Sequence, residues 1–309
     1  MRIISLKPAI TDTVVRLSPP SDLVGVTHLC GVPAEFTKAV MLTKAPSAAT
    51  SYPDADSHRL ARGLCEYHLS IDELVARNPE LILTEVRDPE GDEFTRWAEA
   101  RLSKLTGRRV LIKSLAAADL SGVYNLIEEV GAALGQRAEA RKLAGTIKAQ
   151  VLSWGDSFFN RCRGKRVVVL SGLEPVKVEQ GWIADLVKLV GARPIELPSE
   201  RQGSEITWSD VTASRPDVIV VAPLGFKLSE SVKTFSKVVA LPEWESLPAV
   251  KRGEVIFAAG DALYRPGPRL VKGAAVLISA IAGLDSGYIT ERDEYFKLRY
   301  LELHRHRFL

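Results

Sequence analysis

Cysteine is scarce in this sequence, with three residues in a chain of 309. Cys30, Cys65 and Cys162 are odd in number and show no CxxC spacing, so neither a disulfide framework nor a zinc site is indicated. We expect all three to be buried free thiols.

A strong excess of charge of one sign is also missing. The net charge is +3, from 41 basic and 38 acidic side chains that are mixed along the chain. This balance argues against nucleic acid as a main partner.

Long apolar runs are absent as well, because none approaches the ~20 residues that span a bilayer. The opening stretch MRIISLKPAITD has neither the apolar core nor the cleavage site of a signal peptide. We therefore expect no transmembrane segment and a cytoplasmic location, with the periplasm or cell envelope as the alternative if a leader has been removed.

Motifs of common catalytic sites are missing too. The sequence has no glycine-rich phosphate loop after a strand, no G-x-S-x-G elbow and no H-E-x-x-H pair. We expect a protein that is not an enzyme, although an enzyme that uses cleft carboxylates such as Glu85 and Glu174 stays open.

What the sequence does contain is a repeat. SIDELVARNPELILT, residues 70–84, aligns without a gap with TWSDVTASRPDVIVV, residues 207–221. In each copy a hydroxyl residue caps a helix that begins with acids, a proline ends the helix, and an apolar run typical of a buried parallel strand follows. The repeat indicates two similar lobes, unless it only reflects the likeness of all helix–strand units.

Strand and helix patterns alternate along most of the chain, beginning with a strand at residues 2–6 and a helix at residues 11–17 capped by Thr11. The predicted fold class is α/β, with two Rossmann-like lobes of mainly parallel sheets joined by a long backbone helix. That helix is either continuous or broken near Gly135. The expected segments are an N-terminal lobe (1–118), the connecting helix (119–160), a C-terminal lobe (161–284), and an amphipathic tail (285–309) that packs on the body or binds a partner.

Several stretches carry a resemblance to a known family: RIISLKPAITDTVVRL, LVGVTHLCGVP, WSDVTASRPDVIVVAPLGF and LPEWESLPAVKRGEVIFAAGDALYRPGPRLVKG. They occur in the family's order over residues 2–283, and the last is the most specific. The chain resembles the helical-backbone class of ABC-transporter substrate-binding proteins, most closely their cobalamin-binding branch. The resemblance implies a corrinoid ligand in a cleft between the lobes, no tightly bound cofactor, and an ABC permease as partner.

The sequence departs from the family pattern at three positions. Ala9 stands where the family usually has Ser, Leu29 where it has Glu, and Gly31 where it has Asp. Contacts of those polar side chains are therefore not expected, and haem, an iron chelate or another metal complex stays an alternative ligand. The missing leader leaves a cytoplasmic carrier or sensor as an alternative to a transport component.

The resemblance places the ligand against the loops that follow the strands, where open α/β sheets generally bind ligands. The candidate ligand-binding residues are Lys7, Pro8, Ala9, His28, Glu85, Trp182, Phe226, Tyr264 and Arg265.

Several of these candidates have a second interpretation. Trp182 matches a Gly-x-Trp motif of the family, and its ring would lie against a flat macrocycle unless it is a core tryptophan. Phe226 and Tyr264 share that ambiguity. Arg265 would hold an anionic group of the ligand or pair with a nearby acid.

Histidine gives only a weak metal signal. His28 and Cys30 form a single H-x-C, which favours a structural histidine at a strand end over a metal ligand. His304 and His306 in the tail are expected to face solvent.

The acids of the repeat are candidate docking residues. In the family, an acid on each lobe near this position pairs with arginines of the permease, which implies this role for Glu73, with Asp72 as an alternate, and for Asp210. The other interpretation is that these acids only complement the helix dipole.

Overall fold

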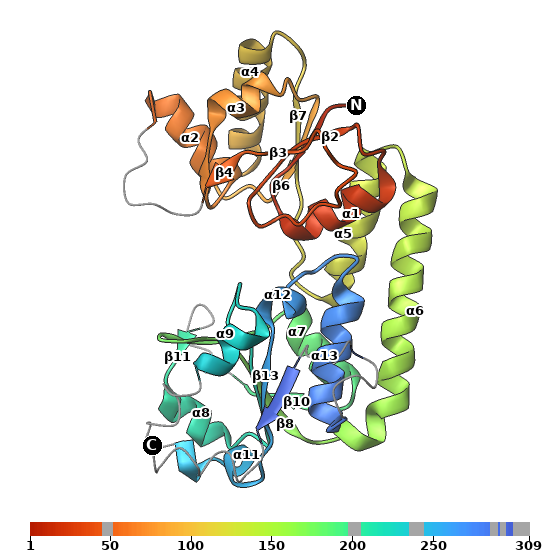
Figure 1. Ribbon diagram of the computed structural model, residues 1–309, viewed down its shortest axis with the longest axis vertical. Helices are drawn as coiled ribbons and strands as arrows, with labels where there is room; N and C mark the ends of the chain where they lie inside the picture. Colours follow the sequence, from red (N-terminus) through yellow and green to blue (C-terminus); the bar gives the residue numbers. More distant parts are fainter. Residues whose placement is uncertain (45–51, 197–204, 235–243, 285–289, 291–294, 299–309) are drawn as a thin grey trace. The chain divides into compact units, whose positions relative to one another are not determined.

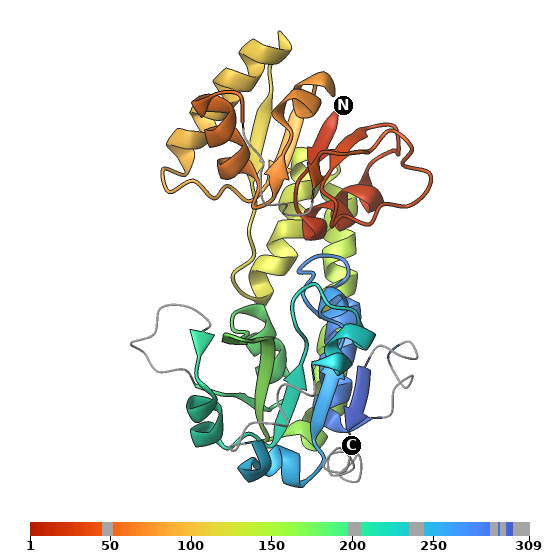
Figure 2. The same ribbon diagram turned by 60° about the vertical axis from the view of Figure 1, so that its left-hand side comes forward.

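The computed structural model describes residues 1–44, 52–196, 205–234, 244–284, 290 and 295–298. The chain divides into two compact units (Figures 1 and 2). Unit 1 consists of Met1–Ala117 and Gly122–Gly145, and unit 2 of Ala118–Ser121 and Thr146–Leu309. Among the described residues, no helix has both the length and the apolar character needed to cross a bilayer.

Unit 1 is built on a parallel sheet with the strand order β3-β2-β1-β6-β7. Its strands are β1 Ile3–Ser5, β2 Leu23–Val26, β3 Val40–Met41, β6 Leu81–Thr84 and β7 Leu111–Ser114. A separate antiparallel pair is formed by β4 Thr43–Lys44 and β5 His68–Leu69. The helices are α1 Pro8–Leu17, α2 Ala55–Leu64, α3 Ile71–Ala76, α4 Asp92–Thr106 and α5 Leu120–Ala133, the last of which begins in unit 2.

The central strands of this sheet are apolar at successive positions because both of their faces are covered. Ile4 and Ile82 pack in one core with residues of α2, α3 and α4, whereas Ile3 and Leu81 pack in a second core with residues of α1 and α5. Figure 1 shows these two groups of helices on the two sides of the sheet. Unit 1 is thus a three-layer α/β arrangement, as the sequence predicts.

Unit 2 has a mixed sheet with the order β11-β9-β8-β12-β13-β14, to which β10 adds beside β8. Its strands are β8 Arg166–Leu173, β9 Val176–Val178, β10 Arg193–Pro194, β11 Glu205–Ile206, β12 Val218–Val221, β13 Val255–Ala258 and β14 Tyr295–Leu298. The central strands β8, β12 and β13 are parallel, and β9, β11 and β14 are antiparallel to their neighbours. The prediction of a mainly parallel sheet is therefore confirmed at the centre of the sheet, and antiparallel strands are added at its edges.

The helical segments of this part of the chain lie on both sides of that sheet. They are α6 Arg137–Cys162, which begins in unit 1, α7 Trp182–Leu189, α8 Trp208–Ser214, α9 Leu228–Lys233, η1 Trp244–Ser246, α11 Pro248–Lys251, α12 Gly260–Leu263 and α13 Leu270–Ala282. One core contains strand residues such as Val168 and Phe257 together with Val211 of α8 and Trp244 of η1.

Both copies of the repeat form the predicted helix and strand. Ser70 is the N-cap of α3 and Thr207 is the N-cap of α8, and each side-chain oxygen accepts the backbone N–H three residues on. The strands that follow are β6 and β12, each buried along its whole length. All three cysteines are buried and free, as predicted.

Three local features differ from the expectation or refine it. The connecting segment forms two helices, α5 and α6, and Gly135 between them has a φ of 74°, which glycine adopts at little cost. The first helix begins at Pro8 rather than at Thr11, because proline is well suited to a first helical turn, and Thr11 is buried inside the helix. Part of the predicted amphipathic tail packs on unit 2 as β14. Apart from Thr290, the other residues of the tail lie outside the described part of the chain, and these include His304 and His306.

Candidate functional site

The carboxyl edge of the sheet in unit 1 gathers several of the predicted binding residues. Lys7 follows β1, His28 lies after β2, and Glu85 follows β6. Because these strands are parallel, the loops that follow them lie at the same edge. Pro8 and Ala9 lie in the first turn of α1 beside Lys7, where Pro8 is half-buried and Ala9 is buried.

Lys7 is the centre of an ion-pair network at this edge. Its Nζ lies 2.9 Å from Oε2 of Glu85 and 3.4 Å from Oε1 of Glu66. The other oxygen of Glu66 lies 3.4 Å from Nη1 of Arg87. Acidic and basic side chains therefore alternate in this network, from Glu85 through Lys7 and Glu66 to Arg87, and its charged groups can form charge-assisted hydrogen bonds with a polar ligand.

His28 and Tyr67 form an aromatic pair at the same edge. Their ring centroids are 4.7 Å apart and the rings are nearly perpendicular, which is a favourable edge-to-face contact. His28 Nδ1 lies 2.8 Å from Oγ1 of Thr43, and this oxygen also accepts the backbone N–H of His28 at 2.9 Å. Thr43 therefore fixes the orientation of the imidazole ring.

The phenol of Tyr67 is held in its protonated form. Burial, and secondarily the neighbouring carboxylate of Glu66, raise the pKa of Tyr67 to about 12. At neutral pH the hydroxyl is consequently neutral and able to donate a hydrogen bond.

Sequence reasoning missed Glu66 and Tyr67. Both lie between α2 and β5, so they do not follow a strand of the main sheet. A prediction based on the residues that follow strands does not include them. Only the tertiary fold brings Glu66 close to Lys7 and Tyr67 close to His28.

The structure gives His28 and Cys30 different partners. The Cys30 thiol is buried between the hydroxyl groups of Thr11 and Thr27, at 3.0 and 3.1 Å, and burial raises its pKa. Within the ranges that the structure describes, no group of three or more His, Cys, Asp or Glu side chains is arranged to hold a metal ion.

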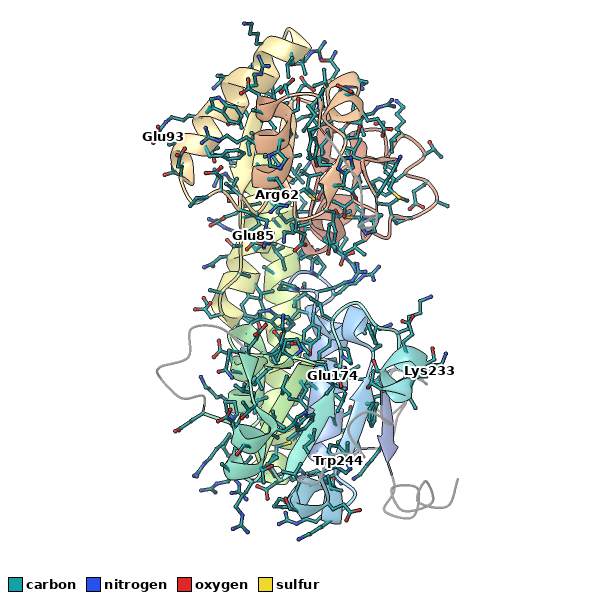
Figure 3. The ribbon with its side chains drawn as sticks, turned by 90° about the vertical axis from the view of Figure 1, so that its left-hand side faces the viewer. Arg62, Glu85, Glu93, Glu174, Lys233 and Trp244 are labelled. Atoms are coloured by element: carbon teal, nitrogen blue, oxygen red, sulfur yellow. The ribbon has the colours of Figure 1, made fainter. Side chains whose placement is uncertain are left out.

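In unit 2, a hollow of about 240 Å³ lies at the carboxyl ends of β8 and β12. Phe226 and Glu174, both expected near a ligand or a reaction centre, line it together with Leu224. The residues Leu224 and Phe226 are 68% and 39% exposed, which is unusual for large apolar residues. Figure 3 labels Glu174 in this unit. The hollow therefore offers an apolar contact surface with one carboxylate beside it.

The remaining candidates of unit 2 are more enclosed. Trp182 is the first residue of α7 and is 8% exposed, which leaves little of its ring for a ligand. Tyr264, directly after α12, has a buried hydroxyl without a hydrogen-bond partner in the described part of the chain, and burial raises its pKa well above the usual value. Arg265 follows it and is half-buried. Their roles in ligand binding stay predictions, as does the cleft expected between the lobes.

The three docking candidates differ in how their carboxylates are used. Asp72 and Glu73 are exposed in the first turn of α3. Asp210 is half-buried, and its Oδ2 accepts the backbone N–H of Thr207 at 2.7 Å and the Thr207 hydroxyl at 2.6 Å. The acid of unit 2 is therefore already part of a capping box.

A family model and several solved structures match this chain. The family described as "Periplasmic binding protein" matches residues 3–262. No curated protein matches the chain.

Solved structures share the fold at low sequence identity. A periplasmic heme binding protein from Pseudomonas aeruginosa is 17% identical over 96% of this chain and 98% of its own, with a TM-score of 0.67. The periplasmic vitamin B12 binding protein BtuF of Vibrio cholerae is 18% identical over 92% and 98%, with a TM-score of 0.63. An ABC transporter substrate-binding protein from Listeria monocytogenes is 16% identical over 90% and 97%, with a TM-score of 0.65. All three are named as binding proteins rather than enzymes.

Proposed function

Because this chain belongs to the periplasmic binding protein family, and is thus a binding protein rather than an enzyme, we propose that it binds a metal-containing macrocycle at the carboxyl edge of the sheet in unit 1. The observation that carries the proposal is the aromatic pair of His28 and Tyr67 beside the ion-pair network of Lys7. Aromatic side chains contact the face of a flat ring system, and charged side chains at the rim pair with its polar side groups.

A corrinoid is the first candidate ligand. The stretches quoted above resemble the cobalamin-binding branch of the family, and the Vibrio cholerae neighbour is named as a vitamin B12 binding protein. The rim of a corrin ring carries amide groups, which both donate and accept hydrogen bonds. Lys7 supplies donors for such groups, and Glu85 supplies acceptors.

Haem is the second candidate, and the position of Tyr67 beside His28 favours it. Imidazole and phenolate are both known axial ligands of haem iron. With a pKa of about 12, Tyr67 would coordinate only if ferric iron displaced its proton. The Pseudomonas aeruginosa neighbour is named as a heme binding protein.

Visible absorption spectroscopy tests the proposal and separates the candidates. The purified chain is titrated with cyanocobalamin and with haem, together with the Tyr67→Phe variant. Tyr67→Phe keeps the ring but removes the hydroxyl, so it should leave corrinoid affinity unchanged and alter the haem spectrum. Tyr52→Phe is the control, because Tyr52 is a half-buried tyrosine of the same unit that packs against His58 and His68 instead. No spectral change with either compound would contradict the proposed function.

The proposed partner is an ABC permease that docks on the exposed acids Asp72 and Glu73 and on Asp210. Unit 1 offers the stronger contact, because Asp210 must leave its capping box to reach an arginine. A carrier or sensor without a permease is the alternative, and the cytoplasmic location expected above stays a prediction.

A further inference from the structure

A surface hollow of about 380 Å³ lies next to the Lys7 network in unit 1. Arg62, Cys65, Glu66, Arg87 and Asp88 line it, so it shares Glu66 and Arg87 with that network. Figure 3 labels Arg62 in this unit together with Glu85 of the network.

Hydrogen bonds between two elements fix the floor of the hollow. The backbone N–H of Arg87 donates to the carbonyl of Gly63 at 2.9 Å. The hydroxyl of Thr84 donates to the carbonyl of Leu64 at 2.6 Å. The end of α2 is thus tied to the end of β6 and to the loop that follows β6.

Arg59 also contacts this loop. Its Nε lies 3.5 Å from Oδ2 of Asp88, and its guanidinium also pairs with Glu90. The guanidinium lies over the ring of Trp97, with Cζ 4.6 Å from the ring centroid. The backbone of Arg87 and the side chain of Asp88 are therefore held in place before a ligand arrives, which lowers the entropic cost of binding.

The unused guanidinium donors of the hollow favour an anion. Its acids already have basic partners, since Glu66 pairs with Lys7 and Arg87, and Asp88 pairs with Arg59. Arg62 is exposed in the last turn of α2, and its side chain forms no hydrogen bond or ion pair with another residue of the described ranges. Arg87 makes one contact of 3.4 Å with Glu66 and is 47% exposed, so most of its donors are unused.

We propose that this hollow binds a carboxylate side arm of the ligand through Arg62 and Arg87, so that the macrocycle taken by this protein carries acidic side groups. A guanidinium binds a carboxylate with two parallel hydrogen bonds, which a neutral amide or ester cannot reproduce. The volume is near the lower end of the ~300–1,000 Å³ of small-molecule pockets, so it suits a side arm rather than the ring itself. The inference rests on the proposed function and specifies the class of macrocycle.

The test compares haem with haem dimethyl ester, which has the same ring and iron but no free carboxylates, and with cyanocobalamin, whose side arms are amides. We expect the wild-type chain to bind haem at least about 10-fold more tightly than the ester, because one charge-assisted hydrogen-bonded pair contributes a difference in affinity of this size. The double variant Arg62→Gln with Arg87→Gln should bind the two compounds equally. Arg109→Gln is the matched control, because Arg109 is an exposed arginine that precedes β7 at the opposite edge of the same sheet, and it should keep the preference.

The outcomes separate this inference from the proposed function. Equal binding of haem and its ester by the wild-type chain, or a preference that survives in the double variant, overturns the carboxylate site while the macrocycle function stands. Binding of cyanocobalamin without binding of haem would also overturn the carboxylate site, while the macrocycle function stands. Failure of all three compounds to bind overturns the proposed function itself, and this inference with it.

Discussion

The two copies of the repeat, residues 70–84 in unit 1 and 207–221 in unit 2, have nearly the same backbone but use their acids differently. The residue before the proline is left-handed in both, with φ of 53° at Asn78 and 47° at Arg215. The residue after the proline also has the same role in both, because Glu80 accepts the backbone N–H of Arg2 at 2.7 Å and Asp217 accepts that of Arg166 at 2.9 Å. In each copy this bond joins the repeat to the start of the neighbouring strand, which is β1 in unit 1 and β8 in unit 2.

The side chains then diverge. Asp217 also pairs with the guanidinium groups of Arg166 and Arg252, at 3.1 and 3.0 Å, whereas the guanidinium of Arg2 donates to the carbonyls of Arg77 and Asn78. Asp210 closes a capping box with Thr207, whereas the carboxylate of Glu73, at the equivalent position, is exposed.

The difference shows which features of a repeat follow from its pattern. Caps, the turn before the proline and the strand depend on residues within a few positions, so both copies share them. The partners of a carboxylate depend on which basic side chains the rest of the fold brings near. Equivalent positions therefore need not have equivalent functions.

The largest expected effect concerns the acid after the proline. Asp217→Asn should lower the free energy of unfolding by about 2 kcal/mol, because two arginines lose a well-shielded anionic partner. Glu80→Gln, its counterpart, should cost less than about 1 kcal/mol, because it weakens a single hydrogen bond. Urea unfolding of both variants measures the difference, and equal losses would contradict the assignment.

The same carboxylate predicts a pH dependence. Hydrogen bonds and charges of Arg166, with Arg252, hold the pKa of Asp217 at about 2, below its ordinary value of 3.8, although burial acts in the opposite direction. A lowered pKa in the folded state stabilises the protein fully above the unfolded value, and this contribution is lost as the pH falls through the folded value. The gap between wild type and Asp217→Asn in urea unfolding should therefore shrink from pH 5 toward about pH 2. A gap that does not change with pH would rule out this ion pair as its cause.

Charge reversal at the helix starts should give a smaller effect on stability. Asp210→Lys removes the capping box and should cost about 1 kcal/mol, whereas Glu73→Lys only loses a favourable interaction with the helix dipole, at about 0.5 kcal/mol. Thermal unfolding measures this contrast.

If the acids also dock on a permease, the double reversal should abolish transport in reconstituted vesicles while ligand affinity persists, and unchanged transport would contradict docking.

The smallest expected effect concerns the left-handed residues. Arg215→Gly should stabilise the chain by about 0.5 kcal/mol, because glycine relieves the strain of a positive φ but loses more entropy on folding. Asn78→Gly should change little, since asparagine tolerates this conformation well. Differential scanning calorimetry can show which of the two variants gains more stability. A larger gain in stability for Asn78→Gly would show that backbone strain does not explain the difference between the two positions.

The sequence was sufficient to predict the central strands and most helices, but only part of the site. The central parallel strands, the buried cysteines and the caps of the repeat follow from local pattern and short-range chemistry. Glu66 and Tyr67 were not predictable in that way, because their closeness to Lys7 and His28 depends on the path of the chain between α2 and β5. The first helix begins at Pro8 and not at the hydroxyl residue Thr11, because proline favours the first turn of a helix more strongly than the capping pattern indicates.

The strand β14 also determines how the sheet of unit 2 ends. It pairs along the full length of β13, with Lys297 Nζ 2.7 Å from Glu254 Oε1 and with the Tyr295 hydroxyl donating to the carbonyl of Leu284. Without this strand, the backbone groups of the apolar strand β13 would form an open edge, and an open edge readily pairs with another chain. The region that contains β14 lies beyond residues 3–262, which match the family. A chain shortened to end before Tyr295 should therefore self-associate through the exposed edge of β13.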